Sequence, residues 1–112
     1  MSVPPAAIIV FCTCPDASTA EALADDLVTA QLAACVNIVP GIRSVYRWQG
    51  AVETATEALL LIKTTRPCYE ALEARIQGQH PYELPEILWV GVGGGLDGYL
   101  TWISQCSSDV SS

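Results

Sequence analysis

The chain has 112 residues, a hydrophobic fraction of 51% and a formal net charge of −7 at pH 7. This length fits one domain with its own core. The negative charge argues against nucleic acids and anionic membranes as partners, because both attract basic surfaces. So apolar a composition in a small protein indicates more apolar surface than one subunit can bury, which favours an oligomer.

The compartment is predicted from the cysteines and from missing signals. No stretch approaches the roughly 18 apolar residues of a membrane span. The apolar start, Met1 to Phe11, lacks the basic residues of a signal peptide. Five cysteines, an odd number, fit reduced thiols better than a disulfide framework. We therefore expect a cytoplasmic protein.

The first elements are a strand and a helix. Ala6–Thr13 is a short apolar run rich in β-branched residues, which is typical of a buried strand. Ser18 and Glu21 have the spacing of a capping box, in which two side chains satisfy free amide groups at a helix start. Apolar residues then recur at helical spacing, so we expect an amphipathic helix that ends near Gln31.

Two long strands follow. The first is predicted over Cys35–Trp48, with Pro40-Gly41 marking a bulge or bend on an edge strand. Gln49-Gly50 is a turn signal, and the second strand runs over Ala51–Thr64. A two-residue turn places Tyr46 opposite Glu53.

The rest of the chain contains three further predicted elements. They are a helix from Pro67 that stops at Gly78, a strand over Glu86–Val92, and, after a turn at Gly93–Gly95, a helix capped by Asp97 that ends at Ile103. We expect the serine-rich tail from Ser104 to fray.

This order predicts an α+β fold, a ferredoxin-like βαββαβ sandwich with an extra C-terminal helix. One domain covers residues 1–112, ordered over roughly 6–104 and frayed over 105–112. The middle strands are longer than such a domain needs, and excess strand length has to pair with something. A second subunit is the obvious candidate, with Trp48 and Trp102 at the interface.

A stiff polar loop precedes the last strand. The run from His80 to Glu86 holds an imidazole, a phenol and carboxylates, and contains two prolines. Proline fixes its own φ and favours extended geometry in the preceding residue. Such a loop is typical of a binding site.

Five stretches of the chain, in the same order, closely resemble the CutA family of divalent-cation tolerance proteins. They are Ala33-Ala34-Cys35-Val36-Asn37-Ile38, Ser44-Val45-Tyr46-Arg47-Trp48-Gln49-Gly50, Ile62-Lys63-Thr64, His80-Pro81-Tyr82-Glu83-Leu84-Pro85-Glu86-Ile87 and Tyr99-Leu100-Thr101-Trp102-Ile103. The likeness extends from Val10 to Ile103. It implies a ferredoxin-like subunit, a homotrimer built by edge-to-edge strand pairing, and a role in tolerance of copper or another divalent cation.

The resemblance implies copper binding at His80 and Cys12. Imidazole suits copper and zinc. Some family members have a second histidine directly before this one, where the chain has Gln79, and an amide is a poor substitute. The alternative for His80 is a hydrogen bond to a backbone carbonyl that holds the loop.

The cysteines allow two interpretations. Cys12 and Cys14 alternate along a strand, so their sulfurs face one side and can bind one soft cation. The alternative for Cys12, Cys14 and Cys35 is packing, because free cysteines usually behave as small buried hydrophobes. No role is assigned to Cys68 or Cys106.

A second expected site is a ligand cleft between subunits, formed by Lys63, Tyr82, Glu86 and Cys35. Lys63 either pairs with Glu86 or Glu57, or binds a carboxylate or phosphate ligand. Binding of a small anionic metabolite would fit an alternative function, a regulatory module resembling the trimeric PII proteins. The chain has neither a nucleophile elbow nor a recognisable catalytic triad, so we do not expect an enzyme.

Overall fold

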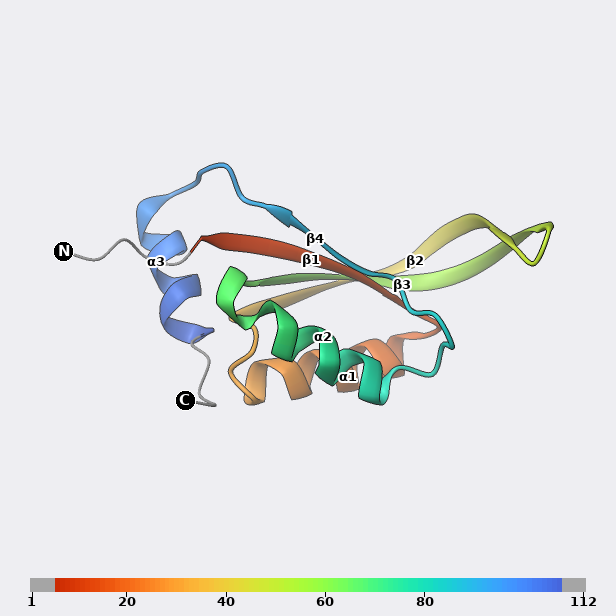
Figure 1. Cartoon of the computed structure of the whole chain (residues 1–112), viewed down its shortest axis with the longest axis horizontal. Helices are drawn as coiled ribbons and strands as arrows, with labels where there is room; N and C mark the ends of the chain where they lie inside the picture. Colours follow the sequence, from red (N-terminus) through yellow and green to blue (C-terminus); the bar gives the residue numbers. More distant parts are fainter. Residues whose placement is uncertain (1–5, 108–112) are drawn as a thin grey trace.

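The computed structural model describes residues 6–107, which form a four-stranded sheet with two long helices against one of its faces (Figure 1). The elements are β1 (Ala7–Cys14), α1 (Ala17–Thr29), β2 (Cys35–Trp48), β3 (Ala51–Thr65), a short 3-10 turn (Arg66–Cys68), α2 (Tyr69–Gln79), β4 (Ile87–Gly91) and α3 (Asp97–Cys106). Among these residues no helix is long and apolar enough to cross a membrane.

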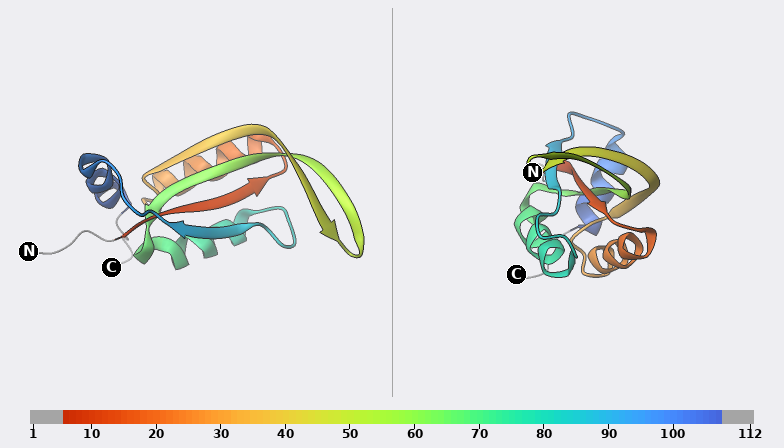
Figure 2. Two further views of the ribbon diagram at one scale, coloured as in Figure 1. Left: turned by 90° about the horizontal axis from the view of Figure 1, so that it is seen from above. Right: turned by 90° about the vertical axis from the view of Figure 1, so that its right-hand side faces the viewer.

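The strand order is β2-β3-β1-β4, and all neighbouring strands are antiparallel. Helix α1 connects β1 to β2 and helix α2 connects β3 to β4, and neither pair of strands is adjacent, which is the split βαβ arrangement of ferredoxin-like domains. The end-on view of Figure 2 shows α1 and α2 side by side beneath the sheet. The predicted α+β class and the order of the elements are confirmed.

The core lies between the sheet and these two helices. Alternate residues of β1 and β3, including Val10, Cys12, Leu60 and Ile62, are fully buried against apolar faces of both helices. The alternation follows from the period of two along a strand. On the opposite face α3 covers only one end of the sheet, where Ala7 packs with Ile103. Farther along this face the apolar residues Ile9, Phe11, Leu59 and Leu61 are only partly buried.

The start of α1 corrects the expected capping box. The N-cap is Asp16, whose Oδ1 accepts a hydrogen bond of 2.8 Å from the Thr19 amide, and the helix begins at Ala17. Ser18 lies inside the first turn and donates its hydroxyl to the same Asp16 oxygen. An aspartate after Pro15 caps as well as a serine does, and it stands earlier in the chain.

β2 and β3 form a long hairpin that projects past the helices (Figures 1 and 2). The predicted turn is confirmed: Gln49 and Gly50 have φ of 51° and 84°, so both central residues are left-handed. Tyr46 lies opposite Glu53, as expected. The Pro40-Gly41 bulge is also confirmed, because β2 is an edge strand and its register shifts between Val39 and Ile42.

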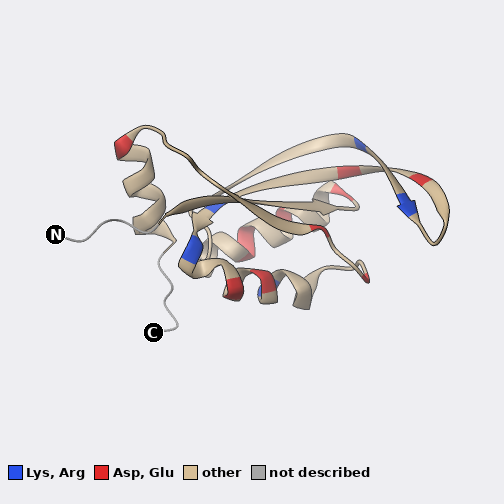
Figure 3. Cartoon of the chain, turned by 45° about the horizontal axis from the view of Figure 1, so that its top comes forward, with Lys and Arg blue, Asp and Glu red and all other residues tan. Residues whose placement is uncertain are grey.

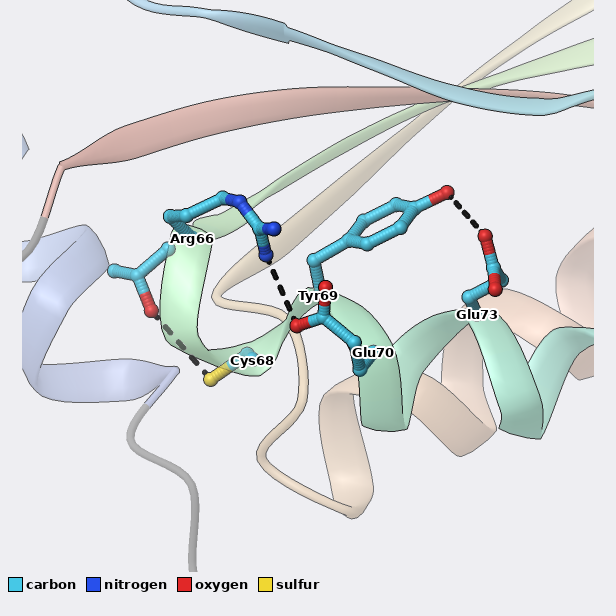
Figure 4. A network of polar contacts seen from close by, with 6 residues as sticks. Arg66, Cys68, Tyr69, Glu70 and Glu73 are labelled. Atoms are coloured by element: carbon cyan, nitrogen blue, oxygen red, sulfur yellow. Dashed lines mark hydrogen bonds and ion pairs between the residues drawn. The ribbon is translucent and has the colours of Figure 1, made fainter.

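A network of polar contacts surrounds the start of α2 (Figure 4). Arg66 donates to Glu70 at 2.9 Å, and the Tyr69 hydroxyl donates to Glu73 at 2.7 Å. The Arg66 guanidinium also lies 5.0 Å from the centre of the Trp89 ring. Of these contacts only the last joins the start of α2 to β4, because the two hydrogen bonds lie within one segment.

Three predicted boundaries shift. Gly78 lies inside α2, which ends at Gln79 because Pro81 forces His80 out of the helical region. Asp97 is the first residue of α3 and not its cap, which is Leu96. The expected fraying from Ser104 is wrong up to Cys106, because α3 includes these residues. Residues 1–5 and 108–112 lie outside the described part of the chain.

Candidate functional site

The His80 side chain is buried at the end of α2, with 9% of its surface exposed. Nδ1 accepts a hydrogen bond of 3.1 Å from the Tyr82 amide, and Nε2 lies 2.7 Å from the Thr13 carbonyl oxygen. Since Nδ1 is an acceptor, Nε2 carries the hydrogen and donates to Thr13. The backbone-bonded alternative for His80 is therefore confirmed, and both ring nitrogens are engaged.

Cys12 and Cys14 lie directly beside this imidazole. Both thiols are fully buried and face the helices, since their partners on β3 are Leu60 and Ala58. The expected shared side of this Cys-x-Cys pair is confirmed. The two sulfurs and a ring nitrogen of His80 all lie within 4.8 Å of one another. Among residues 6–107 this is the only set of three or more His, Cys, Asp or Glu side chains that is close enough to hold one ion.

The two thiols are electrostatically different. The pKa of Cys12 is raised by its hydrogen bond with Cys14, by burial, and by the negative charges of Cys14, Glu86 and Glu57. The same hydrogen bond lowers the pKa of Cys14. Cys12 therefore keeps its proton, and Cys14 is the sulfur more easily converted to a thiolate, which is the form that binds metals.

The donor set fits a soft or borderline cation. Thiolate sulfur selects copper(I) and zinc, and imidazole suits copper and zinc, whereas hard cations prefer oxygen. The side chain of Gln79, which precedes His80, is bound to α1, where its amide nitrogen donates to Asp26 at 2.7 Å. A metal would therefore meet two sulfurs and one nitrogen.

A pocket of about 660 Å³ lies on the other side of the same loop. It contains two of the four residues expected in the ligand cleft, Tyr82 and Glu86. The Tyr82 hydroxyl donates to Glu57 at 2.6 Å. Burial and this hydrogen bond raise the pKa of Tyr82 well above its usual range.

The other two expected cleft residues lie elsewhere. Lys63 and Cys35 are cross-strand partners near the opposite end of the sheet. Lys63 donates to Asn37, and its ammonium lies 5.9 Å from the centre of the Tyr99 ring. The four residues do not meet within one subunit.

The predicted ion pair between Lys63 and Glu57 or Glu86 is wrong. Lys63 lies six positions along β3 from Glu57, a span of about 20 Å. Glu86 precedes Ile87, whose partner on β1 is Cys12, whereas Lys63 pairs with Ile9. Sequence reasoning missed Glu57 as a site residue, because its contact with Tyr82 joins a strand to a loop 25 residues away.

Three comparisons with known proteins show which family the chain resembles. A model of the family described as "CutA1 divalent ion tolerance protein" matches residues 8–106. The "Divalent-cation tolerance protein CutA" of Pectobacterium atrosepticum is 43% identical over 98 residues, which are 88% of this chain and 89% of that protein.

The "Protein CutA, chloroplastic" of Arabidopsis thaliana is also 43% identical over 98 residues, covering 88% of this chain and 54% of that protein. The crystal structure of CutA1 from Oryza sativa superposes with a TM-score of 0.93 at 39% identity, and covers 96% of this chain and 99% of that chain.

Proposed function

The chain belongs to the CutA1 divalent ion tolerance family, and from this premise we propose that it binds a soft metal ion, copper first, through Cys12, Cys14 and His80. The observation that carries the proposal is the meeting of two sulfurs and an imidazole nitrogen within 4.8 Å. Copper(I) prefers thiolate ligands and accepts few of them, so this donor set suits it.

Binding has a defined structural consequence at His80. Nε2 donates to the Thr13 carbonyl, and Nδ1 accepts from the Tyr82 amide. An ion can take either nitrogen only if one of these hydrogen bonds breaks. The sulfurs therefore bind first, and His80 joins after the loop has moved. Because all three side chains are buried, entry also requires a local opening of the structure.

The test is a competition titration with copper(I) and zinc, starting from metal-free protein. We expect Cys12→Ala and Cys14→Ala each to weaken copper binding by about tenfold or more, and His80→Gln by less. Cys68→Ala is the matched control, because Cys68 is equally buried but bonds to the Ser107 carbonyl, away from this cluster. Unchanged copper affinity in both cysteine variants would contradict the proposal.

We further propose that the protein acts as a homotrimer. The sheet face that α1 and α2 leave uncovered carries Ile9, Phe11, Leu59 and Leu61, which are only partly buried. Apolar residues of this kind on a small acidic subunit are typical of an interface. Light scattering should give three times the subunit mass at micromolar concentration, and a monomer mass would contradict the assembly.

A cytoplasmic location, the absence of catalysis, and the absence of nucleic-acid and membrane partners also remain proposals. The net charge of −7 and the odd number of cysteines support them. The Arabidopsis thaliana relative is named as a chloroplastic protein, so family membership alone does not determine the compartment. Recovery of the native protein from a periplasmic or membrane fraction would contradict this location.

The PII-like alternative depends on a cation that is free to bind an anionic metabolite. The expected cation, Lys63, instead donates to Asn37 and lies over Tyr99. No contact among residues 6–107 favours this alternative over metal binding. A thermal shift with nucleotides or organic acids that Lys63→Ala abolishes would revive it.

A further inference from the structure

The aromatic–acidic pocket, as we call the second cavity, lies between the projecting part of the β2–β3 hairpin and the loop that follows α2. It is lined by Thr13, Ser44, Val45, Tyr46, Trp48, Glu57, Pro81, Tyr82, Glu83, Leu84 and Glu86. Its volume of about 660 Å³ is in the range of small-molecule sites. It is distinct from the cluster of Cys12, Cys14 and His80.

Negative charge dominates the lining. Of the residues that the structure describes, those around this pocket include the carboxylates Glu57, Glu83 and Glu86 and no lysine, arginine or histidine. Figure 3 shows acidic segments on β3 and in the loop between α2 and β4. The ion pairs within residues 6–107, Arg66–Glu70 and Arg75–Asp26, lie elsewhere.

Glu57 is the decisive residue. Only 8% of its surface is exposed, and its hydrogen-bond partner is the Tyr82 hydroxyl, at 2.6 Å. Burial and the bond to Glu57 raise the pKa of Tyr82, so the phenol stays protonated and leaves the negative charge of the carboxylate uncompensated. A buried carboxylate with no cation beside it is unfavourable. A positively charged ligand next to Glu57 would therefore be stabilised.

Aromatic side chains supply the rest of the recognition. Tyr46 and Trp48 come from alternate positions of β2, and Tyr82 comes from the loop. Arg47 lies between them in the sequence, and neither it nor Arg43 lines the pocket. Aromatic faces attract cations, and they attract alkylated ammonium ions most usefully because these ions carry little bound water.

We propose that this pocket binds a small organic ammonium ion. A bare divalent ion fits less well, because Glu57, Glu83 and Glu86 do not form a close ligand set, whereas Cys12, Cys14 and His80 do. The pocket is also much larger than an ion. An alkylated ammonium group would place its positive charge near Glu57 and its alkyl surface against Tyr46, Trp48 and Tyr82.

The first experiment is calorimetry with metal-free, fully assembled protein. The probes are choline and 3,3-dimethyl-1-butanol, a neutral molecule of the same shape. We expect choline to bind with a Kd below about 1 mM and the alcohol to bind at least about tenfold more weakly. Equal affinity for the two probes, or no binding of choline at about 10 mM, would overturn the proposal.

A peptide that contains trimethyllysine tests the source of the ammonium group. Binding of this peptide much more tightly than choline would assign the pocket to a protein partner and overturn the small-molecule proposal. Binding no tighter than choline would support it.

Matched variants locate the site. Glu57→Gln should weaken choline binding by about tenfold, whereas Glu21→Gln, which removes the same charge from the outer face of α1, should leave it unchanged. Trp48→Leu should weaken it by about fivefold or more. Trp102→Leu is its control, because both tryptophans are 40% exposed but only Trp48 lines the pocket.

Two outcomes distinguish this pocket from the metal cluster and from a contact between subunits. Cys12→Ala should bind choline as the wild type does, so that a failure of metal binding leaves this proposal standing. If Glu57→Gln leaves choline affinity unchanged while Trp48→Leu dissociates the assembly, the pocket is a contact between copies of the chain, and the proposal is wrong.

Discussion

The two ends of strand β3 are in contrasting environments. From Ala58 to Thr65 the strand pairs with β1, from Leu59 to Lys63 it also pairs with β2, and every second residue is buried against the helices. From Ala51 to Thr56 it has only β2 beside it, and its residues are exposed or nearly so. The chain is 53 Å long mainly because of this projecting hairpin (Figure 1).

The contrast shows which part of the fold one subunit can stabilise. Leu60 is fully buried, whereas Val52, on the same strand, is 66% exposed. A two-stranded ribbon without a packed face is at best marginally stable in water. The part of the sheet that the helices cover, which includes Ala58 to Thr65, is therefore stabilised within one subunit. We call it the helix-covered half. The projecting hairpin depends on a contact outside the subunit.

The largest effect is expected in the helix-covered half. Leu60→Ala should lower the free energy of unfolding by about 2–5 kcal/mol, because it removes buried methyl groups and leaves a cavity. Chemical denaturation measures this loss. A change below about 1 kcal/mol would mean that the core can collapse around the site, and would weaken the contrast.

A substitution at the tip of the hairpin should change the affinity between subunits and not the stability of one subunit. We expect Val52→Asp to weaken assembly by about tenfold or more, since it would bury a charge in the contact. The measurement is light scattering over a dilution series, with Val52→Thr as a control of similar shape. If the mass remains that of the wild type at every concentration, the exposed tip takes no part in assembly.

A smaller effect concerns the link between the helices. Hydrogen bonds from Arg75 and Gln79 lower the pKa of Asp26 from its ordinary value of 3.8 to about 2. A carboxyl with a lowered folded-state pKa stabilises the fold above its unfolded-state value, and the stabilisation is lost as the pH falls from about 5 towards 2. The contribution should stay below about 1 kcal/mol, because water screens this partly exposed pair.

Asp26→Asn tests this link. Its free energy of unfolding should fall less steeply than that of the wild type between about pH 5 and pH 2. Asp25→Asn removes the same charge one position away and should keep the wild-type slope. Identical slopes for the Asp26 variant and the wild type would show that the pair does not stabilise the fold.

The smallest effect is expected at the hairpin turn. Gln49→Asn should stabilise the fold by about 0.5 kcal/mol, since asparagine tolerates the left-handed backbone that Gln49 adopts. Gly50→Ala is the opposing control and should cost about 1 kcal/mol, because its φ is also positive. Thermal unfolding distinguishes the two, and a destabilised Gln49→Asn would contradict the turn geometry.

Local pattern was enough to predict most of the fold. The bounds of β2 follow from strand periodicity and from Gln49-Gly50, and the shared side of Cys12 and Cys14 follows from alternation alone. Helix ends were less predictable, because Asp16 and Ser18 are both good caps and only the packed helix selects one.

The site was predictable only in part. That His80 approaches Cys12 and Cys14 depends on how a loop after α2 meets strand β1, which no spacing in the sequence encodes. The partner of Lys63 was predicted from charge, yet strand register placed Asn37 beside it. Contacts between distant elements follow from the assembled fold and not from local residue type.

The bulge in β2 has a consequence for insertions and deletions. Val39 pairs with Leu59 but Ile42 pairs with Glu57, so β2 contains one more residue than β3 over this stretch. Side chains alternate between faces, so the parity of this count sets the orientation of everything beyond it. Deleting one residue here would move side chains to the opposite face of the sheet, either in the tip beyond the bulge or in the base before it.

Either reversal would be damaging. Turning the tip would point Arg43 and Arg47 into a pocket that now has acidic and aromatic walls. Turning the base would take Val36 and Ile38 away from the core they pack against. We therefore expect single-residue length changes in β2 to be far less tolerated than changes of two residues, which preserve the parity.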